Sequence, residues 1–446
     1  MLSPVLVIAL TQLVVAAPAG PPTVPEAPVL PAELTLEEAV RVLRERGLDL
    51  LVAEASVEGA QGDVQAAAAI KNPILSGSFG KSRAFSGCTD AQGNPVSCGW
   101  LPDPALAVGL SDDGAIFDAL SGKRRMRIAV ARAALEASRA SRDDALRTLT
   151  AQVKIQFLQQ LLAQDALRFA REVAGASART FELTKVRYEE GAINEADLAR
   201  IEVAKLESDQ SVDLASQSLR DARAQLAFLL GVRSRVPEFA VTAPDLEHFA
   251  VPPGLAAPDP DTLLAAAREA RPDLAAALRQ RERTEAALAL ARRQRFPDVS
   301  LSFNYSQQGT TPSATTPPTF TFGVSIPLPL FYRQQGEIRH AEADLASQSI
   351  TSAKVEAQVA TDVESALADW QSAGNLARRM EGGLLERARR ARDLVEIQYR
   401  KGAASLLELL DAQRTYIATS AEYRQDLAAY WTSVFKLEQA VGRSLR

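Results

Sequence analysis

An internal duplication constrains this 446-residue chain more than any other feature of its sequence. The segment that begins at Tyr188 matches the segment that begins at Tyr399 when the numbering is shifted by a constant 211 positions, without a gap. Gly191 then falls on Gly402. Each glycine permits a positive φ after the tyrosine, and a long run without proline follows it. We therefore predict a tight turn followed by a long helix, twice.

The second copy shows how its helix packs. Leucine or tyrosine recurs every seven positions, at Leu409, Tyr416, Tyr423, Tyr430 and Leu437. A heptad seam of this kind is typical of helices that pack lengthwise against other helices. The chain is also 47% hydrophobic and only 6% aromatic, a balance that favours long packed helices over compact sheets.

The segments upstream of each tyrosine repeat as well. In both halves a helical stretch (35–70 and 261–295) gives way to residues that alternate between apolar and small or polar side chains, the period of a strand. Long proline-free helical stretches follow, over 122–187 and 336–400. We predict a tandem duplication of helix, hairpin, long helix, tip and return helix. The predicted boundaries are 34–231 for the first repeat (strands about 74–86 and 104–111, tip about 188–194), 232–260 for a proline-rich linker, and 261–442 for the second repeat (strands about 299–308 and 319–326, tip about 399–405).

The N-terminus has the pattern of a secretory signal. Residues 5–17 form an apolar run that is too short to span a bilayer comfortably and ends at small residues. No Lys or Arg precedes Arg41, so the usual positive segment before the apolar run is missing. We expect a signal peptide at 1–19 and an extended proline-rich arm at 20–33.

The remaining reactive residues are few. Cys88 and Cys98, the only cysteines, lie in a polar loop, and in an exported protein they favour a loop-closing disulfide over two free thiols or half of a metal site. The two histidines, His248 and His340, have no neighbours at ligand spacing and are expected to be surface or packing residues. We find no catalytic or phosphate-binding motif, so we expect neither enzyme activity nor a cofactor. The net charge of −5 without a basic stripe argues against nucleic-acid binding.

Four strands with one apolar face cannot close a barrel by themselves. In a bilayer, open edges leave backbone donors and acceptors unsatisfied. Two copies of the chain would supply eight strands and a filled interior, whereas three would supply twelve strands and a lumen. The helices carry charges all round, so we expect them to extend from the membrane as a soluble tube. A barrel continued by a tube is a duct. The alternative of another class is a periplasmic or surface coiled-coil scaffold whose hairpins pack without lipid.

The Tyr-x-x-Gly tips, the segment SLLELLDAQRTY (405–416) and the duplicated hairpins resemble the TolC-like outer-membrane efflux channels over essentially all of 34–442. The resemblance implies a mainly α fold with a small β part. Three copies would form a homotrimer in the outer membrane of a Gram-negative bacterium, with a twelve-stranded β-barrel in lipid, continued by a periplasmic α-helical barrel. It also implies docking to a periplasmic membrane-fusion adaptor and an inner-membrane efflux pump of the RND type.

Two segments, 187–198 and 323–338, are similar to the cobalt, zinc and cadmium efflux branch of that family. That branch usually has Asn where this chain has Tyr332 and Gln334. The expected cargo is therefore divalent heavy-metal cations, with selectivity residing in the partners. Organic drugs or a secreted protein of a type I system are the alternative cargoes.

Two carboxylates stand near the start of the second return helix. Glu408 and Asp411 are three residues apart and share one helical face. In a trimer they would form two acidic rings that favour cations, and the related channels carry acidic rings at these positions of the tunnel entrance. The spacing alone favours carboxylates that complement the helix dipole, and the resemblance brings the acidic rings level with that interpretation.

The resemblance also assigns a gate and a docking surface. Asp197 and Tyr399 match positions that form a gating bond between hairpins in related channels, and a basic residue that assists it there corresponds to Ala404 here. The alternative for Tyr399 is a packing role in the seam. The tips are the expected contact for the adaptor, because small residues let another hairpin approach closely, unless they are simply tight turns. The tip residues are Gly191, Ala192, Ile193, Gly402, Ala403, Ser405 and Leu406.

Overall fold

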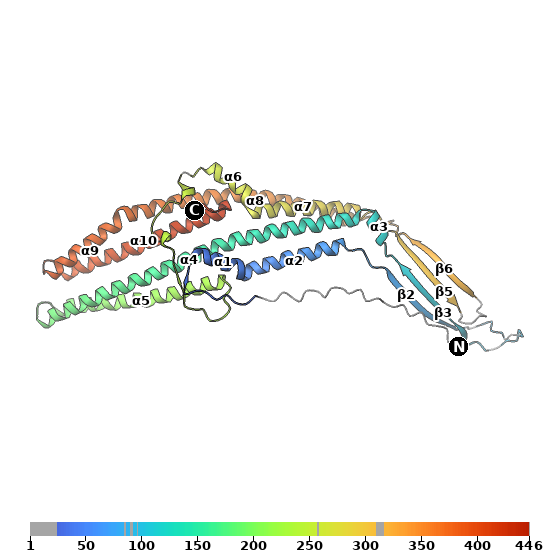
Figure 1. Ribbon diagram of the computed structural model, residues 1–446, viewed down its shortest axis with the longest axis horizontal. Helices are drawn as coiled ribbons and strands as arrows, with labels where there is room; N and C mark the ends of the chain where they lie inside the picture. Colours follow the sequence, from blue (N-terminus) through green and yellow to red (C-terminus); the bar gives the residue numbers. More distant parts are fainter. Residues whose placement is uncertain are drawn as a thin grey trace.

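The computed structural model of the chain is an elongated molecule with long helices at one end and a small sheet at the other (Figure 1). It describes residues 25–83, 86–89, 92–95, 97–256, 258–308 and 316–445. The predicted signal peptide, part of the proline-rich arm and parts of both hairpin loops lie outside the described residues.

The two repeats follow the same order of elements. The first comprises α1 (Leu36–Arg46), α2 (Leu48–Ala68), β2 (Ile74–Arg83), β3 (Trp100–Ser111), α3 (Ala115–Leu120), α4 (Lys123–Glu189) and α5 (Glu195–Leu229). The second comprises α6 (Pro260–Ala270), α7 (Pro272–Arg293), β5 (Ser300–Gln308), β6 (Thr316–Ser325), α8 (Gln335–Arg379), α9 (Leu385–Arg400) and α10 (Leu406–Val441). The short strands β1 (Glu33–Leu34) and β4 (Ala240–Val241) pair in parallel and join the N-terminal arm to the linker.

The first helix of each repeat is interrupted where the sequence predicted a continuous helix. Gly47 separates α1 from α2, and a side chain there would stand 2.6 Å from the Leu43 carbonyl oxygen. In the second repeat Arg271 leaves the helical region, with ψ at 118°, because Pro272 follows it. The prediction of one helix over 35–70 and one over 261–295 was therefore wrong at these two positions.

The long helix of the second repeat is also interrupted. Residues Met380–Leu384 form a π-turn between α8 and α9, whereas α4 of the first repeat is continuous over 67 residues. The turn contains Gly382 and Gly383, which lower the cost of leaving the α-helical geometry.

The four longer strands form one antiparallel sheet in the order β2-β3-β5-β6, which leaves β2 and β6 at its edges. One face is apolar: Leu75, Leu110, Phe303 and Phe322 lie side by side across it, and all but the partly exposed Phe303 are exposed. The other face is small and polar, with Ser76, Gly109, Asn304 and Thr321 in one row. A Cβ at position 109 would stand 2.3 Å from Asn304 Oδ1, so a larger residue there would require the Asn304 side chain to move.

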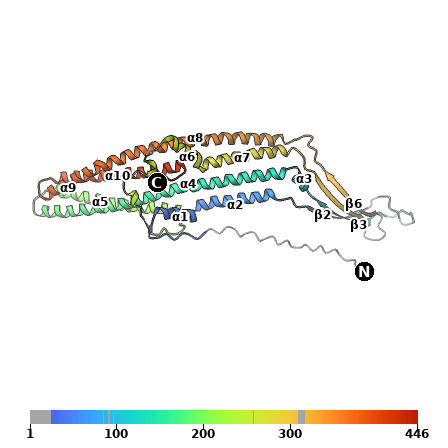
Figure 2. The same cartoon turned by 45° about the horizontal axis from the view of Figure 1, so that its top comes forward.

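The helices pack around α4, which contacts α2 and α7 toward the sheet and α5 and α10 toward the tip. The main hydrophobic core lies where both repeats meet the linker, and a smaller one lies near the tip. Both views show the hairpins α4–α5 and α9–α10 extending in the same direction, away from the strands (Figures 1 and 2). None of the described helices is long and apolar enough to cross a membrane.

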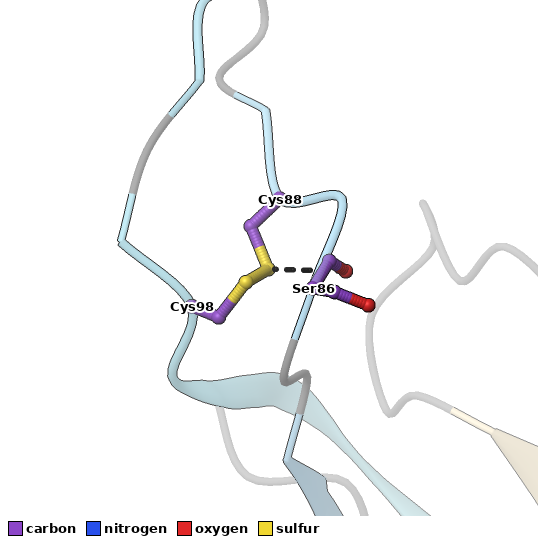
Figure 3. The surroundings of a disulfide bond; sticks show 3 residues. All are labelled: Ser86, Cys88 and Cys98. Atoms are coloured by element: carbon purple, nitrogen blue, oxygen red, sulfur yellow. Dashed lines mark hydrogen bonds between the residues drawn. A yellow bond between two sulfur atoms is a disulfide. The ribbon is translucent and has the colours of Figure 1, made fainter.

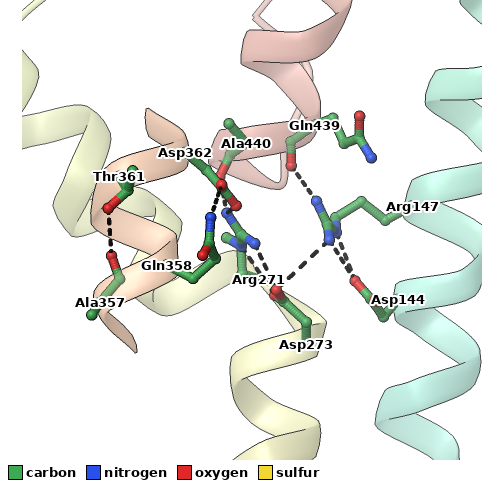
Figure 4. A network of polar contacts seen from close by, with 10 residues as sticks. All are labelled: Asp144, Arg147, Arg271, Asp273, Ala357, Gln358, Thr361, Asp362, Gln439 and Ala440. Carbon is green, nitrogen blue, oxygen red and sulfur yellow. Dashed lines mark hydrogen bonds and ion pairs between the residues drawn. The ribbon is translucent and has the colours of Figure 1, made fainter. Parts of the chain in front are cut away.

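A buried ion network fixes the end of α10 against both repeats (Figure 4). Arg271, whose side chain is 4% exposed, binds Asp273 at 2.6 Å and Asp362 at 2.9 Å. It also donates to the Ala440 carbonyl oxygen at 3.3 Å, while Arg147 of α4 donates to the neighbouring carbonyl oxygen of Gln439. Burial by itself would raise the pKa of Asp273, but the Arg271 guanidinium outweighs it and the pKa is lowered. The network thus ties α4, α7, α8 and α10 together.

Candidate functional site: the helical tip

Two tight turns form the end of the molecule opposite the sheet (Figure 1). In the first turn Gly191 adopts φ +73°, and in the second Gly402 adopts φ +77°. The backbone N–H of the next residue, Ala192 or Ala403, donates to a carbonyl five residues earlier at 2.8 Å in both turns. This pattern ends a helix by satisfying its last carbonyls and depends on the left-handed glycine. The duplicated glycines therefore define two turns of the same geometry.

Most of the predicted docking residues are exposed at these turns. Gly191, Ala192, Gly402, Ala403 and Ser405 are exposed, and Ile193 is partly exposed. A Cβ added at either glycine would meet no atom within 4 Å, so the surface there is open. The exception is Leu406, which is 7% exposed and belongs to the chain's own core. Its neighbour Leu407 is 65% exposed, a surface leucine that the tip motif alone did not single out.

A small hydrophobic cluster holds the two hairpins together just behind the turns. Its buried members are Ile201 of α5, Tyr399 of α9, and Leu406 and Leu409 of α10, with Phe181 of α4 packed against them. Every helix of the two hairpins contributes to it. Burial of these side chains stabilises one relative placement of the hairpins near the tip.

Tyr399 makes the main polar contact of this cluster. Its hydroxyl lies 3.1 Å from Thr184 Oγ1, and Thr184 donates its own proton to the Thr180 carbonyl at 2.8 Å. The Tyr399 hydroxyl is therefore the donor in this bond. Arg187 lies over the tyrosine ring, 4.7 Å from its centre, and donates to the last carbonyls of α9. Tyr399 thus joins α9 to α4 through packing, a hydrogen bond with Thr184 and a cation–π contact with Arg187.

The gating bond expected between Asp197 and Tyr399 is not formed within the described part of the chain. Tyr399 bonds Thr184 instead, and the carboxylate of Asp197 pairs with Arg200 at 3.1 Å, one turn along α5. The packing alternative for Tyr399 describes its surroundings better, because its side chain is only 5% exposed.

Glu408 caps its own helix. Its carboxylate accepts from the backbone N–H of Ser405 at 2.7 Å, and the Ser405 hydroxyl in turn accepts from the Glu408 N–H at 3.3 Å. This reciprocal capping box satisfies two donors of the helix N-terminus. The hydrogen bond from the Ser405 backbone lowers the pKa of Glu408, so the carboxylate is charged at neutral pH. Asp411, one turn further along, is exposed.

The cysteines lie at the opposite end, in the loop between β2 and β3. Cys88 and Cys98 form a disulfide with Cα atoms 5.4 Å apart (Figure 3). The bond closes a loop with a sequence separation of 10 residues. A crosslink of this kind limits the conformations of the loop.

The histidines lie apart from the tip. His340 is exposed and pairs with Asp344 at 3.0 Å, one turn along α8. His248 lies in the linker, where its carbonyl oxygen accepts from the Trp431 indole at 3.3 Å. Among the described residues, no group of three or more His, Cys, Asp or Glu is placed to hold a metal ion.

The duplicated helices, the amphipathic hairpins and the paired tips define the class of protein: residues 39–232 and 263–443 match the outer membrane efflux protein family, and the chain belongs to it. It is an outer-membrane efflux channel with a large periplasmic helical part. Channels of this family are homotrimers that act with an adaptor and an inner-membrane pump. The family and the location predicted from the sequence are thereby confirmed.

Two members of known name are similar to this chain over nearly its whole length. It is 26% identical over 423 residues to the cobalt-zinc-cadmium resistance protein CzcC of Cupriavidus metallidurans, covering 93% of both chains. It is 28% identical over 448 residues to the pyoverdine export outer membrane protein OpmQ of Pseudomonas putida, covering 96% of this chain and 92% of OpmQ.

Solved structures confirm the predicted fold class. The crystal structure of CusC matches with a TM-score of 0.73 at 20% identity over 92% of both chains. The outer membrane protein VceC from Vibrio cholerae matches with a TM-score of 0.69 at 19% identity, over 92% of this chain and 97% of VceC. The mainly helical fold with a small β part is therefore shared along nearly the whole chain.

Proposed function

We propose that three copies of this chain close into one duct, a twelve-stranded barrel in the outer membrane continued by a periplasmic helical tube. The sheet order supports this proposal, because β2 and β6 are its two edges and carry unpaired backbone groups in a single chain. If β6 of one copy pairs with β2 of the next, three sheets of four strands close without an edge. The small polar face then lines the lumen, and the apolar face meets lipid.

The helical edges support the same head-to-tail arrangement. Near the tip, α5 exposes Val203, Leu206 and Leu214, while α9 exposes Leu394 and Ile397. These helices are the outer members of the two hairpins, since α4 and α10 contact each other between them. Packing α9 of one copy against α5 of the next buries both apolar rows.

The cargo that we propose is a divalent heavy-metal cation. The observation that carries this proposal is the similarity to CzcC over 93% of both chains. The duct passes the cation without binding it tightly, and the inner-membrane pump and its adaptor supply energy and selectivity. Export of an organic compound is the second candidate, favoured by the similarity to OpmQ at 28% identity.

The tip supplies the proposed entrance. With three-fold symmetry, the exposed carboxylates of Asp411 form a ring that favours cations, and Glu408 forms a second ring that also serves as the helix cap. Tyr399 is the proposed gate residue, with Thr184 as its partner within the chain. Asp197, which pairs with Arg200 in the first turns of α5, is the second proposed gate residue. The exposed turn residues, with Leu407 in place of Leu406, form the proposed contact for the adaptor.

The test is the growth of a deletion strain against graded zinc, cobalt, cadmium and copper and a panel of organic drugs. We expect sensitivity to the divalent metals, rescued by the wild-type gene and not by Glu408→Ala/Asp411→Ala at equal trimer levels. The matched control is Glu422→Gln on the exposed face of α10, which should rescue fully. Sensitivity to organic drugs alone would exclude the metal cargo and leave the duct standing.

A further inference from the structure

A cavity of about 560 Å³ lies within the single chain, between the two hairpins and the linker. Its walls come from α4, α10, the π-turn with the start of α9, and linker residues 241–248. The volume falls in the range of small-molecule sites, which combine apolar walls with a few polar groups. The apolar part of the wall includes Leu161, Leu246, Leu385, Leu427 and the rings of Tyr416 and Tyr423.

The wall contains one buried hydroxyl group, that of Ser420, without a hydrogen-bond partner among the described residues. Ser420 is 2% exposed, and its Oγ makes no hydrogen bond among the described residues. The backbone carbonyl oxygen of Ser420, in contrast, accepts a hydrogen bond from the Arg424 guanidinium at 2.8 Å. Buried polar atoms are nearly always paired, and an unpaired one marks a place where a further molecule completes the bonding.

The charges of the wall are unevenly paired. Four carboxylates and three guanidinium groups line the cavity. Asp165 binds two of the three guanidinium groups, those of Arg168 and Arg424. The other charged groups of the wall are Glu247, which also lies near Arg168, and Glu381, Glu386 and Arg389. The four carboxylates and three guanidinium groups therefore sum to a charge of −1, and the acidic side of the cavity is the one that carries Glu381 and Glu386.

The aromatic part of the wall adjoins this acidic side. The hydroxyl of Tyr423 donates to Glu381 at 3.3 Å, and the π-turn carries Glu381 at this position. Burial, reinforced by the charge of Glu381, raises the pKa of Tyr423 to about 12, so the phenol stays neutral. A neutral tyrosine ring next to carboxylates attracts an organic cation through its π face.

We propose that this cavity is a binding site for an organic monocation with an apolar body, held by Glu381 and Glu386 on one side and Glu247 on the other. The apolar body packs between α4 and α10, and a polar group of the ligand pairs with Ser420. The site is formed by residues of a single chain. A ligand bound there bridges both hairpins and the linker.

The test uses tetraphenylphosphonium as the probe, in isothermal titration of the full-length protein purified in a non-ionic detergent. We expect saturable binding of one probe per chain, weakened about tenfold in Glu381→Gln/Glu386→Gln, because two attractive charges are lost. Glu422→Gln, on the same helix as Tyr423 but outside the cavity, should bind as the wild type does. Tetraphenylborate has the same shape and the opposite charge, and should only partition into micelles.

A second variant separates loss of the site from loss of the fold. Leu385→Trp fills the cavity and keeps every charge, and should abolish saturable binding while circular dichroism stays unchanged. Equal affinity of the wild type and the double glutamine variant would overturn the proposal. So would saturable binding of tetraphenylborate, or unchanged binding in Leu385→Trp.

Discussion

The two tips share one turn geometry but differ in what lies behind the turn. Tyr188 of the first tip is 38% exposed, whereas its counterpart Tyr399 is 5% exposed. Tyr399 bonds Thr184, while the residue that corresponds to Thr184 in the second repeat is Val395, which cannot accept a hydrogen bond. The two repeats therefore share the turn but differ in the residues behind it. Of the two tyrosines, only Tyr399 forms a hydrogen bond between the hairpins within the described residues.

The helix caps differ in the same way. Ser405 and Glu408 form a reciprocal capping box at the second tip. At the first tip Asn194 caps α5 alone, and the shorter Asp197 pairs with Arg200 instead. The second tip therefore has more local contacts that stabilise it than the first. We assign the proposed gate to this second tip because Tyr399 also contacts the other hairpin there.

The largest expected effect comes from removing the two tyrosines in turn. Tyr399→Ala deletes a buried ring and should lower the free energy of local opening at the tip by about 3 kcal/mol. Tyr188→Ala removes an exposed ring and should change it by less than about 0.5 kcal/mol. Hydrogen exchange of the α9–α10 and α4–α5 turn amides measures both. Equal effects of the two substitutions would mean that the asymmetry is not energetic.

A smaller effect should follow when only the hydroxyl is removed. Tyr399→Phe keeps the packing and loses the bond to Thr184, at a cost of about 1 kcal/mol. Thr184→Val should cost a similar amount, and the double variant should cost little more than either single one, because the same bond is lost. The measurement is a double-mutant cycle by hydrogen exchange. Additive effects would show that the two hydroxyls do not interact.

The caps should respond alike to substitution but differently to pH. Ser405→Ala and Asn194→Ala should each cost about 1 kcal/mol of helix stability. Because the pKa of Glu408 is lowered below its ordinary value of 4.5, its contribution is present at neutral pH and lost as the pH falls below 4.5. Exchange of the first-turn amides of α10 between pH 6 and pH 3 tests this, with Glu408→Gln as the control. A profile unchanged by Glu408→Gln would contradict the cap.

The smallest expected effect on stability belongs to Asp411. It is exposed, so Asp411→Asn should change the stability by less than about 0.5 kcal/mol. In the proposed trimer the substitution removes one acidic ring, so the preference of the pore for cations should fall. Reversal potentials in a salt gradient measure this preference. A stable variant with unchanged selectivity would remove Asp411 from the entrance.

Periodicity and duplication made most of the fold predictable. Alternation in the hairpins and the proline-free stretches placed the strands and long helices within a few residues of their observed bounds. The break at Arg271 could have been predicted from Pro272, because the residue before a proline disfavours the α-helical region. The π-turn at Gly382 and Gly383 was harder to predict from the sequence, because glycine inside a helix is often tolerated.

The site was less predictable, because its contacts join distant segments. Thr184 lies 215 positions before Tyr399, and no local pattern connects them. The inward position of Leu406 and the outward position of Leu407 depend on how α10 turns against α5, which the tip motif does not specify. For Glu408 the sequence offered a carboxylate that complements the helix dipole as the alternative to an acidic ring, but the capping box with Ser405, three residues earlier, was not predicted.

The proposed duct and its gate are tested most directly by the conductance of the purified protein in planar lipid bilayers, compared among wild type, Tyr399→Ala and Tyr188→Ala. We expect a cation-selective channel whose low conductance rises when Tyr399 is replaced and stays unchanged when Tyr188 is replaced. Absence of channels from correctly folded protein would contradict the duct. Equal conductance of the two variants would contradict the assignment of the gate to the second tip.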